Sequence, residues 1–226
     1  MSEEAKAVQE VAKTAGKAID ATAGSARFLA KFVSAPLEQA VGILVDHLKY
    51  IRFERGVRLQ QRAEALMKEA GLDAPTREIP IALALPIMQH ATLEEDDSLQ
   101  DRWAALLVNA ANASFEGEVL RSYPSMLSQL SPFDALVLDV IYAQPYELAH
   151  HMGIATVDLP NSARVIGEDE LDQPSPSDKV VISLSNLVRL GLLRPSYTWG
   201  GGESFGRVNP TVAGRTFVRA CQVKSP

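Results

Sequence analysis

The sequence predicts a mainly α-helical protein: an N-terminal helical bundle followed by a C-terminal winged-helix-like domain with a small antiparallel β hairpin. Three observations predict this fold class. Apolar residues recur at helical spacing over long stretches. Prolines and glycines stand where helices would begin and end. The last part of the chain carries a helix, a strand, three consecutive glycines, a second strand and a helix, in that order. We therefore divide the chain into residues 1–35, 36–118 and 119–226.

The composition predicts a globular, cytoplasmic protein. The chain has 226 residues, 46% of them hydrophobic and 22% charged, with a net charge of −6. This acidic balance argues against a general nucleic-acid or anionic-membrane footprint, which needs a basic excess. A single cysteine, Cys221, excludes an intramolecular disulfide framework. The first residues, MSEEAKAVQE, lack the pattern of a secretory signal, and no apolar run is long enough to predict a membrane-spanning helix.

The first two regions predict helices of different character. Residues 3–23 form an alanine-rich helical segment, whose small side chains bury little surface. A longer helical segment runs from Ala26 to Ala70, is interrupted at Pro36, and ends before Gly71. Basic residues recur along it at spacings of three and four: Lys49, Arg52, Arg55, Arg58 and Arg62. They form either a solvated face or a set of contacts to an anionic surface.

A short apolar helix at residues 81–90 and a second, amphipathic helix are predicted next. The sequence from Thr92 to Glu95 matches a capping box. The second helix then carries one apolar stripe at helical spacing: Leu99, Trp103, Leu106, Leu107 and Ala110. The carboxylates from Glu94 to Asp97, together with Asp101, suit the positive end of a helix dipole. Binding of a divalent cation is the alternative, although the spacing lacks the glycine and ligand alternation of an EF-hand loop.

The third region predicts helices at residues 120–130 and 131–142, the second opened by Ser131 and Pro132. An acidic loop follows at residues 165–178, and then a helix that ends at Gly191. Glycines 200–202 form the tip of the expected hairpin, or wing. On the helix before it, the pattern leaves three polar side chains on the expected exposed face as candidate contacts to DNA or to a partner: Ser185, Asn186 and Arg189.

The sequence predicts no catalytic residue, no metal site and no cofactor. The four histidines are His47, His90, His150 and His151, and none pairs with another His or Cys at a helical ligand spacing. Cys221 has the apolar surroundings of a buried thiol, and no base can be assigned to it. The three glycines lack the lysine and the strand-to-helix context of a phosphate-binding loop. We therefore expect a protein that is not an enzyme.

One family-level resemblance emerges from these residues. The runs QHATLEEDDSLQDRWAALLVNAA, SYPSMLSQLSPFDALVLD and ISLSNLVRLGLL resemble the bacterial abortive-infection alpha family. The residues that carry it are Pro86, Asp96, Asp97, Leu99, Trp103, Leu106, Leu107, Ala110, Pro124, Leu130, Ser131, Asp134, Ala135, Asn186, Leu187, Arg189, Leu190, Gly191 and Leu192. The resemblance covers roughly residues 36–221 and is densest from 80 to 138. It implies a role in defence against phage, and it supplies no catalytic residues.

Together these observations predict a non-enzymatic phage-defence protein that acts through interaction with a host or phage component, and we expect a protein partner. The alanine-rich N-terminal helix is a candidate contact between copies of the chain, so a homo-oligomer is a further possibility. Two alternatives are kept. One is a winged-helix DNA-binding regulator, which is disfavoured because five carboxylates precede the candidate recognition helix directly. The other is a membrane-acting effector, which would make peripheral contacts to lipid through the amphipathic segment 27–62.

Overall fold

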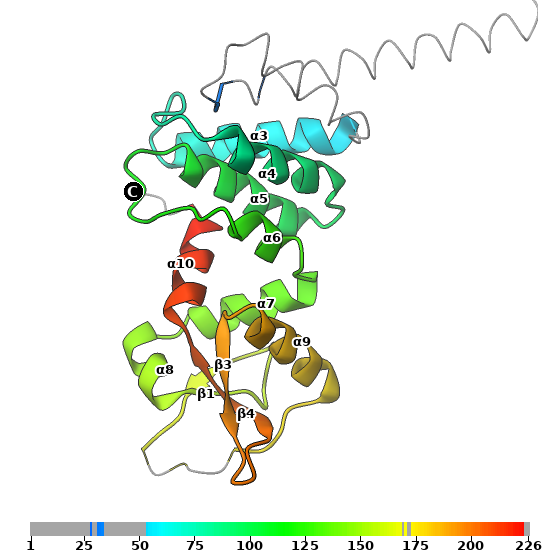
Figure 1. The fold of residues 1–226 in the computed structure, drawn as a ribbon, viewed down its shortest axis with the longest axis vertical. Coiled ribbons are helices and arrows are strands. Elements are labelled where there is room, and N and C mark those ends of the chain that lie inside the picture. Colours follow the sequence, from blue (N-terminus) through cyan, green and yellow to red (C-terminus); the bar gives the residue numbers. More distant parts are fainter. Residues whose placement is uncertain (1–27, 29–30, 34–52, 169, 171–172, 224–226) are drawn as a thin grey trace, which may run out of the picture. The chain divides into compact units, whose positions relative to one another are not determined.

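The computed structural model describes residues 28, 31–33, 53–168, 170 and 173–223. Within these residues the chain forms eight helices and one antiparallel sheet of four strands (Figure 1). It divides into an N-terminal unit, residues 1–116 with 223–226, and a C-terminal unit, residues 117–222. The mainly helical class with a small antiparallel sheet is confirmed. Most of the predicted segment 1–35 and the first part of the predicted region 36–118 lie outside the described residues.

Three helices pack on one another in the N-terminal unit: α3 (Phe53–Glu69), α4 (Ile81–Leu93) and α5 (Asp97–Ala110). Helix α3 ends at Glu69, and Gly71 follows with φ of +71°, so the predicted glycine stop is confirmed. Pro80 precedes α4 in extended geometry. The predicted apolar stripe of α5 is fully buried, and its largest member, Trp103, is completely enclosed.

The predicted capping box between α4 and α5 is wrong. Thr92 lies inside α4, where its hydroxyl donates to the backbone oxygen of Met88 at 2.8 Å. The cap of α5 is Asp96, whose Oδ1 accepts from the backbone N–H groups of Ser98 (3.0 Å) and Leu99 (2.9 Å). The apolar run of α4 continues through Leu93, so α4 extends three residues beyond its predicted end at His90. Asp96 is then the first residue that can cap α5.

The C-terminal unit contains the sheet and five helices. Its helices are α6 (Tyr123–Leu127), α7 (Pro132–Tyr142), α8 (Tyr146–Met152), α9 (Asp178–Arg189) and α10 (Val212–Ala220). Its strands are β1 (Ile154–Ala155), β2 (Arg164–Val165), β3 (Leu193–Tyr197) and β4 (Glu203–Pro210). The sheet order is β2-β1-β4-β3, and every neighbouring pair is antiparallel. The predicted hairpin and final helix are therefore present. Two strands that were not predicted, β1 and β2, extend the sheet on the β4 side of the hairpin.

Local signals in this unit set several boundaries. Ser131 caps α7 in a true capping box with Asp134, so the predicted helix start at Ser131 and Pro132 is confirmed. The segment predicted as a helix at residues 120–130 is helical only in α6. Within the predicted acidic loop, Val165 belongs to β2 and Asp178 already begins α9. Helix α9 ends before Gly191, which has φ of +74°.

The Tyr142 hydroxyl joins three segments of the C-terminal unit. It donates to the backbone oxygen of Leu192 at 2.5 Å and accepts from the backbone N–H of Thr211 at 3.0 Å. Burial raises the pKa of Tyr142 to about 12. A glycine is required beside it, because a Cβ on Gly214 would lie only 1.9 Å from the Tyr142 oxygen. The end of α7, the start of β3 and the start of α10 are thereby held together.

Among the described residues, no helix combines the length and the apolar character that crossing a membrane requires.

Candidate functional site

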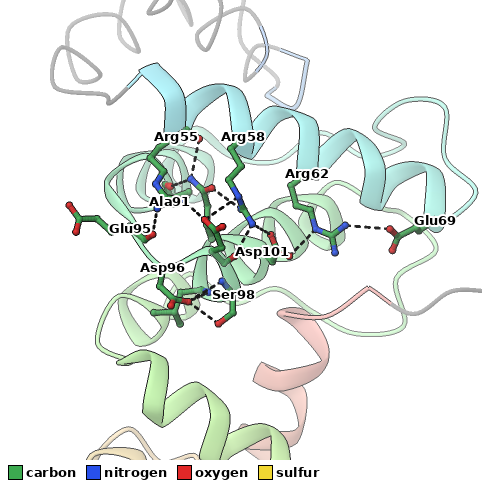
Figure 2. Close-up of polar contacts among 12 residues, drawn as sticks. Arg55, Arg58, Arg62, Glu69, Ala91, Glu95, Asp96, Ser98 and Asp101 are labelled. Atoms are coloured by element: carbon green, nitrogen blue, oxygen red, sulfur yellow. Dashed lines mark hydrogen bonds and ion pairs between the residues drawn. The ribbon is translucent and has the colours of Figure 1, made fainter.

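The basic stripe of α3 faces the acidic start of α5 (Figure 2). Arg58 pairs with Asp97 (Nε to Oδ1, 3.2 Å) and with Asp101 (Nη2 to Oδ1, 3.0 Å). Arg62 pairs with Asp101 (Nε to Oδ2, 3.0 Å), and Arg55 binds the carboxylate of Asp97 and the backbone oxygen of Glu95. The two charged runs that the sequence showed separately thus lie against each other.

Gln100 is the buried centre of this contact. Its Nε2 donates to the backbone oxygens of Arg55 (3.0 Å) and Ala91 (2.8 Å), and its Oε1 accepts from Arg58 (2.8 Å). Hydrogen bonds from the Leu99 backbone and then from the Ser98 hydroxyl lower the pKa of Asp96. The arrangement links α3 to both α4 and α5 through hydrogen bonds and ion pairs. It is the geometry of a helix contact, with the carboxylates occupied by arginines.

The predicted anionic-surface contacts are only partly within the described residues. Lys49 and Arg52 lie outside them, whereas Arg55, Arg58 and Arg62 are the residues just described in ion pairs. Three apolar side chains of the candidate membrane segment, Phe28, Phe32 and Val33, are buried. An anionic surface would have to displace carboxylates that already neutralise these arginines. The proposed lipid-contact role remains a prediction.

A second polar cluster lies between α7 and α9, around the buried carboxylate of Asp134. Its Oδ1 accepts from the Ser183 hydroxyl at 2.6 Å, and its Oδ2 accepts from Asn186 Nδ2 at 3.1 Å. Oδ2 also accepts from the backbone N–H and the hydroxyl of Ser131, each at 2.9 Å. We call Ser131, Asp134, Ser183 and Asn186 the Asp134 cluster. The Asp134 side chain therefore completes the capping box of α7 and also binds two side chains of α9.

The three candidate contact residues of α9 are engaged within the C-terminal unit. The Ser185 hydroxyl donates to the backbone oxygen of Val181 at 2.8 Å. Asn186 is half-buried, and its Nδ2 donates to Asp134 Oδ2 in the Asp134 cluster. Arg189 is exposed, but its guanidinium donates to Gln129 Oε1 (2.9 Å) and Asn186 Oδ1 (2.6 Å). The hydrogen bond between Asn186 and Asp134 joins residues that are far apart in the sequence.

The exposed residues of α9 are Asp178, Lys179, Ile182 and Arg189, and the Lys179 ammonium lies over the Phe133 ring, 4.1 Å from its centroid. Ile182 is 71% exposed in the middle of this solvent face. The β3–β4 hairpin exposes two larger apolar side chains, Tyr197 and Trp199, and Trp199 is fully exposed. Sequence analysis assigned the wing tip to the glycines and passed over these aromatic residues. The signal was their position, because SYTW leads directly into the three glycines of a predicted turn.

Two of the histidines that the structure describes, His90 and His150, make contacts within the fold. The His90 ring stacks on Trp103 with centroids 5.4 Å apart, and burial lowers its pKa. His150 lies near the end of α8, and its Nδ1 is 2.8 Å from the backbone oxygen of Pro210. Because a carbonyl only accepts, Nδ1 carries the proton in this contact. Cys221 is buried, as its pattern predicted. Over the described ranges, no three His, Cys, Asp or Glu side chains gather closely enough to hold a metal ion.

Comparison with known proteins identifies one family. Curated proteins and solved structures gave no significant match. The model of the family described as "abortive infection alpha" matches residues 54–221, from the start of α3 to the end of α10. The match includes the ion-paired contact of α3 with α5 and the whole Asp134 cluster. Because it covers well over half of the sequence, the chain belongs to the abortive infection alpha family.

Proposed function

We propose that this chain is a non-enzymatic, cytoplasmic phage-defence protein that acts through a protein partner bound by its C-terminal unit. Membership of the abortive infection alpha family suggests the defence role. The single observation that carries the proposed mode of action is the exposure of Ile182, Tyr197 and Trp199 on α9 and the β3–β4 hairpin. Large apolar and aromatic side chains on a surface are typical of sites that bind other proteins.

The order of elements supports a winged helix as the framework of this unit. Helices α7, α8 and α9 precede the β3–β4 hairpin, and β4 pairs with the short strand β1 on its other side. In a winged helix of this kind, the helix before the hairpin, here α9, and the hairpin itself are the elements that reach a partner. Fold alone does not decide whether that partner is DNA or protein, so the exposed side chains must decide it.

The chemistry of α9 favours protein over DNA. A recognition helix needs donors that are free to reach base edges or phosphates. The guanidinium of Arg189 is engaged by Gln129 and Asn186, and Ile182 occupies the middle of the solvent face. Asp178 begins the helix and would repel a phosphate. A winged-helix DNA-binding regulator is therefore the weaker alternative.

The defence role is tested by phage challenge of cells with and without the gene, scoring plaques and survival. We expect protection at low multiplicity and death of infected cells at high multiplicity. An unaltered plating efficiency across a broad phage panel would contradict the proposal. A gel-shift assay at low ionic strength tests the DNA alternative, and we expect no salt-sensitive binding to a mixed-sequence duplex.

A further inference from the structure

The tip of the β3–β4 hairpin is a closed turn that presents one tryptophan. Thr198 closes it twice: its backbone N–H donates to the Gly202 oxygen at 2.7 Å, and its Oγ1 accepts from the Gly202 N–H at 3.0 Å. A further bond joins the Gly201 N–H to the Thr198 oxygen at 2.8 Å, and Gly201 has φ of +81°. The turn is thus fixed by its own hydrogen bonds, and Trp199 lies within it.

Two aromatic side chains close together in the sequence are exposed at this tip. Trp199 is fully exposed, and Tyr197, at the end of β3, is 68% exposed. Both are rigid side chains with few rotatable bonds, so fixing them in a complex loses little conformational entropy. Tryptophan and tyrosine are also the residues most often found as binding hot spots. An exposed tryptophan on a hydrogen-bonded turn is therefore well suited to fill a pocket in another molecule.

The charge around the tip distinguishes between classes of partner. Glu203 lies directly across from Tyr197 in the β3–β4 register, and the next charged residues along the two strands, Arg194 and Arg207, lie further from the tip. Interfacial membrane segments and single-strand binding surfaces surround their aromatics with Lys and Arg, because lipid headgroups and phosphates are anionic. A carboxylate at this position opposes both. It complements a basic group instead.

We propose that residues 197–203 form a docking element for a protein partner, in which Trp199 enters an apolar pocket and Glu203 faces a basic residue at the pocket rim. This inference rests on the proposed function and specifies the site and the chemistry of the partner. The pocket supplies the apolar burial, and the rim charge sets orientation and association rate.

Photo-crosslinking in infected cells tests the docking element in the full-length chain. A crosslinking phenylalanine analogue replaces Tyr197, which leaves Trp199 in place. The same analogue in place of Leu148 is the control, since Leu148 is 58% exposed on α8 of the same unit. We expect one protein to crosslink from position 197 and not from position 148. The captured protein is then purified and titrated against the wild-type chain and its variants.

Substitutions give the quantitative result. Trp199→Ala is expected to weaken binding of the purified partner by roughly 30-fold or more, as a hot-spot residue does. Glu203→Lys is expected to slow association, with an effect that shrinks at high salt. Leu148→Ala should leave both unchanged. Equal binding by the wild-type chain and the Trp199→Ala variant would overturn the proposal.

Two probes test the other classes of partner directly. The emission of Trp199 is isolated by subtracting the spectrum of the Trp199→Phe variant from that of the wild-type chain. We expect no change in this difference spectrum with vesicles of equal parts phosphatidylcholine and phosphatidylglycerol, or with a single-stranded oligonucleotide. A blue shift with vesicles, or quenching with the oligonucleotide, would replace the protein partner by a membrane or a nucleic acid. If even the wild-type chain gives no phage protection, the proposed function fails, and the binding results are judged separately.

Discussion

Two helix contacts of this molecule use polar side chains in opposite ways. In the contact between α3 and α5, three arginines meet two carboxylates that keep access to solvent: the side chain of Asp97 is 68% exposed and that of Asp101 35% (Figure 2). In the contact between α7 and α9, a single carboxylate, Asp134, is 6% exposed and accepts four hydrogen bonds. The α3–α5 contact contains more charged groups, whereas the one carboxylate of the α7–α9 contact is more deeply buried.

The difference teaches that burial, and not the number of charges, decides how strongly a polar contact constrains the fold. An exposed ion pair contributes about 0–1 kcal/mol, because water and salt screen it. A buried group that loses its partner has no water to replace it, and each such loss costs about 1–3 kcal/mol. The Asp134 cluster should therefore be the critical polar contact, although the arginine stripe is the more conspicuous feature of the sequence.

The largest effect on folding is expected from Asp134→Ala. It removes the N3 partner of the α7 capping box, leaves the Ser183 hydroxyl without its acceptor and leaves Asn186 Nδ2 only the Gln129 backbone oxygen, so we expect a loss of about 3 kcal/mol. The change is measured by hydrogen exchange of α7 and α9 peptides in the full-length chain. Asp158→Ala, at an exposed aspartate of the same unit, is the control and should have little effect. Unchanged protection of α9 in Asp134→Ala would break the comparison.

A smaller loss is expected from Tyr142→Phe, which removes the hydroxyl that links α7 to the backbone of Leu192 and Thr211. The Thr211 N–H and the Leu192 oxygen lose a partner, and we expect a loss of about 1–2 kcal/mol near neutral pH. Denaturant midpoints of the two chains, followed through exchange of α10 peptides, measure it. Identical midpoints would show that the backbone groups find other partners.

The same hydroxyl predicts a dependence on pH. The pKa of Tyr142 is raised from 10.0 to about 12 in the folded chain, so the neutral form is favoured there. Its contribution to stability is complete below the unfolded pKa and is lost as pH rises from about 10 to about 12. The stability difference between the wild-type chain and Tyr142→Phe should therefore shrink across this window. A difference that stays constant with pH would exclude Tyr142 as the titrating group.

The exposed contact should respond more weakly. Asp101→Asn removes the carboxylate that Arg58 and Arg62 share, and we expect a loss below about 1 kcal/mol. The loss should diminish further in about 1 M salt, where the Debye length is about 3 Å. Hydrogen exchange of α3 peptides at low and high salt measures it. A salt-insensitive loss as large as that of Asp134→Ala would reverse the ranking of the two contacts.

The smallest effect on stability is expected from Trp199→Ala. The side chain is fully exposed, and such substitutions change the free energy of unfolding by less than about 0.5 kcal/mol. Exchange of β3 and β4 peptides should match the wild-type chain. A clear loss of protection in the hairpin would mean that Trp199 supports the fold and would weaken its role as a free docking side chain.

Sequence reasoning succeeded where the signal was local. Gly71 and Gly191 end helices because they adopt positive φ, and Ser131 with Pro132 starts α7. The apolar stripe through Trp103 is buried because helical periodicity specifies one face. These signals need only a few neighbouring residues, so the helical class and the hairpin could be predicted.

It failed where distant segments decide the outcome. Thr92 and Asp96 are both good caps, and the choice between them depends on how far the apolar run of α4 stays packed. Strands β1 and β2 have two residues each, too few for an alternating pattern. Periodicity placed Asn186 on a polar face, and its hydrogen bond to Asp134 could not be predicted from it. The pairing of the α3 arginines with the α5 carboxylates was equally invisible to spacing within one helix.

On the function proposed above, the polar clusters maintain the fold and the exposed hairpin tip binds the partner in phage defence. The most direct test compares phage plating on cells that carry the wild-type chain, Trp199→Ala or the Leu148→Ala control, at matched protein abundance. We predict that Trp199→Ala abolishes the reduction in plaques although its folding is unchanged, and that Leu148→Ala protects like the wild-type chain. Full protection by Trp199→Ala would contradict the claim and move the function away from the hairpin.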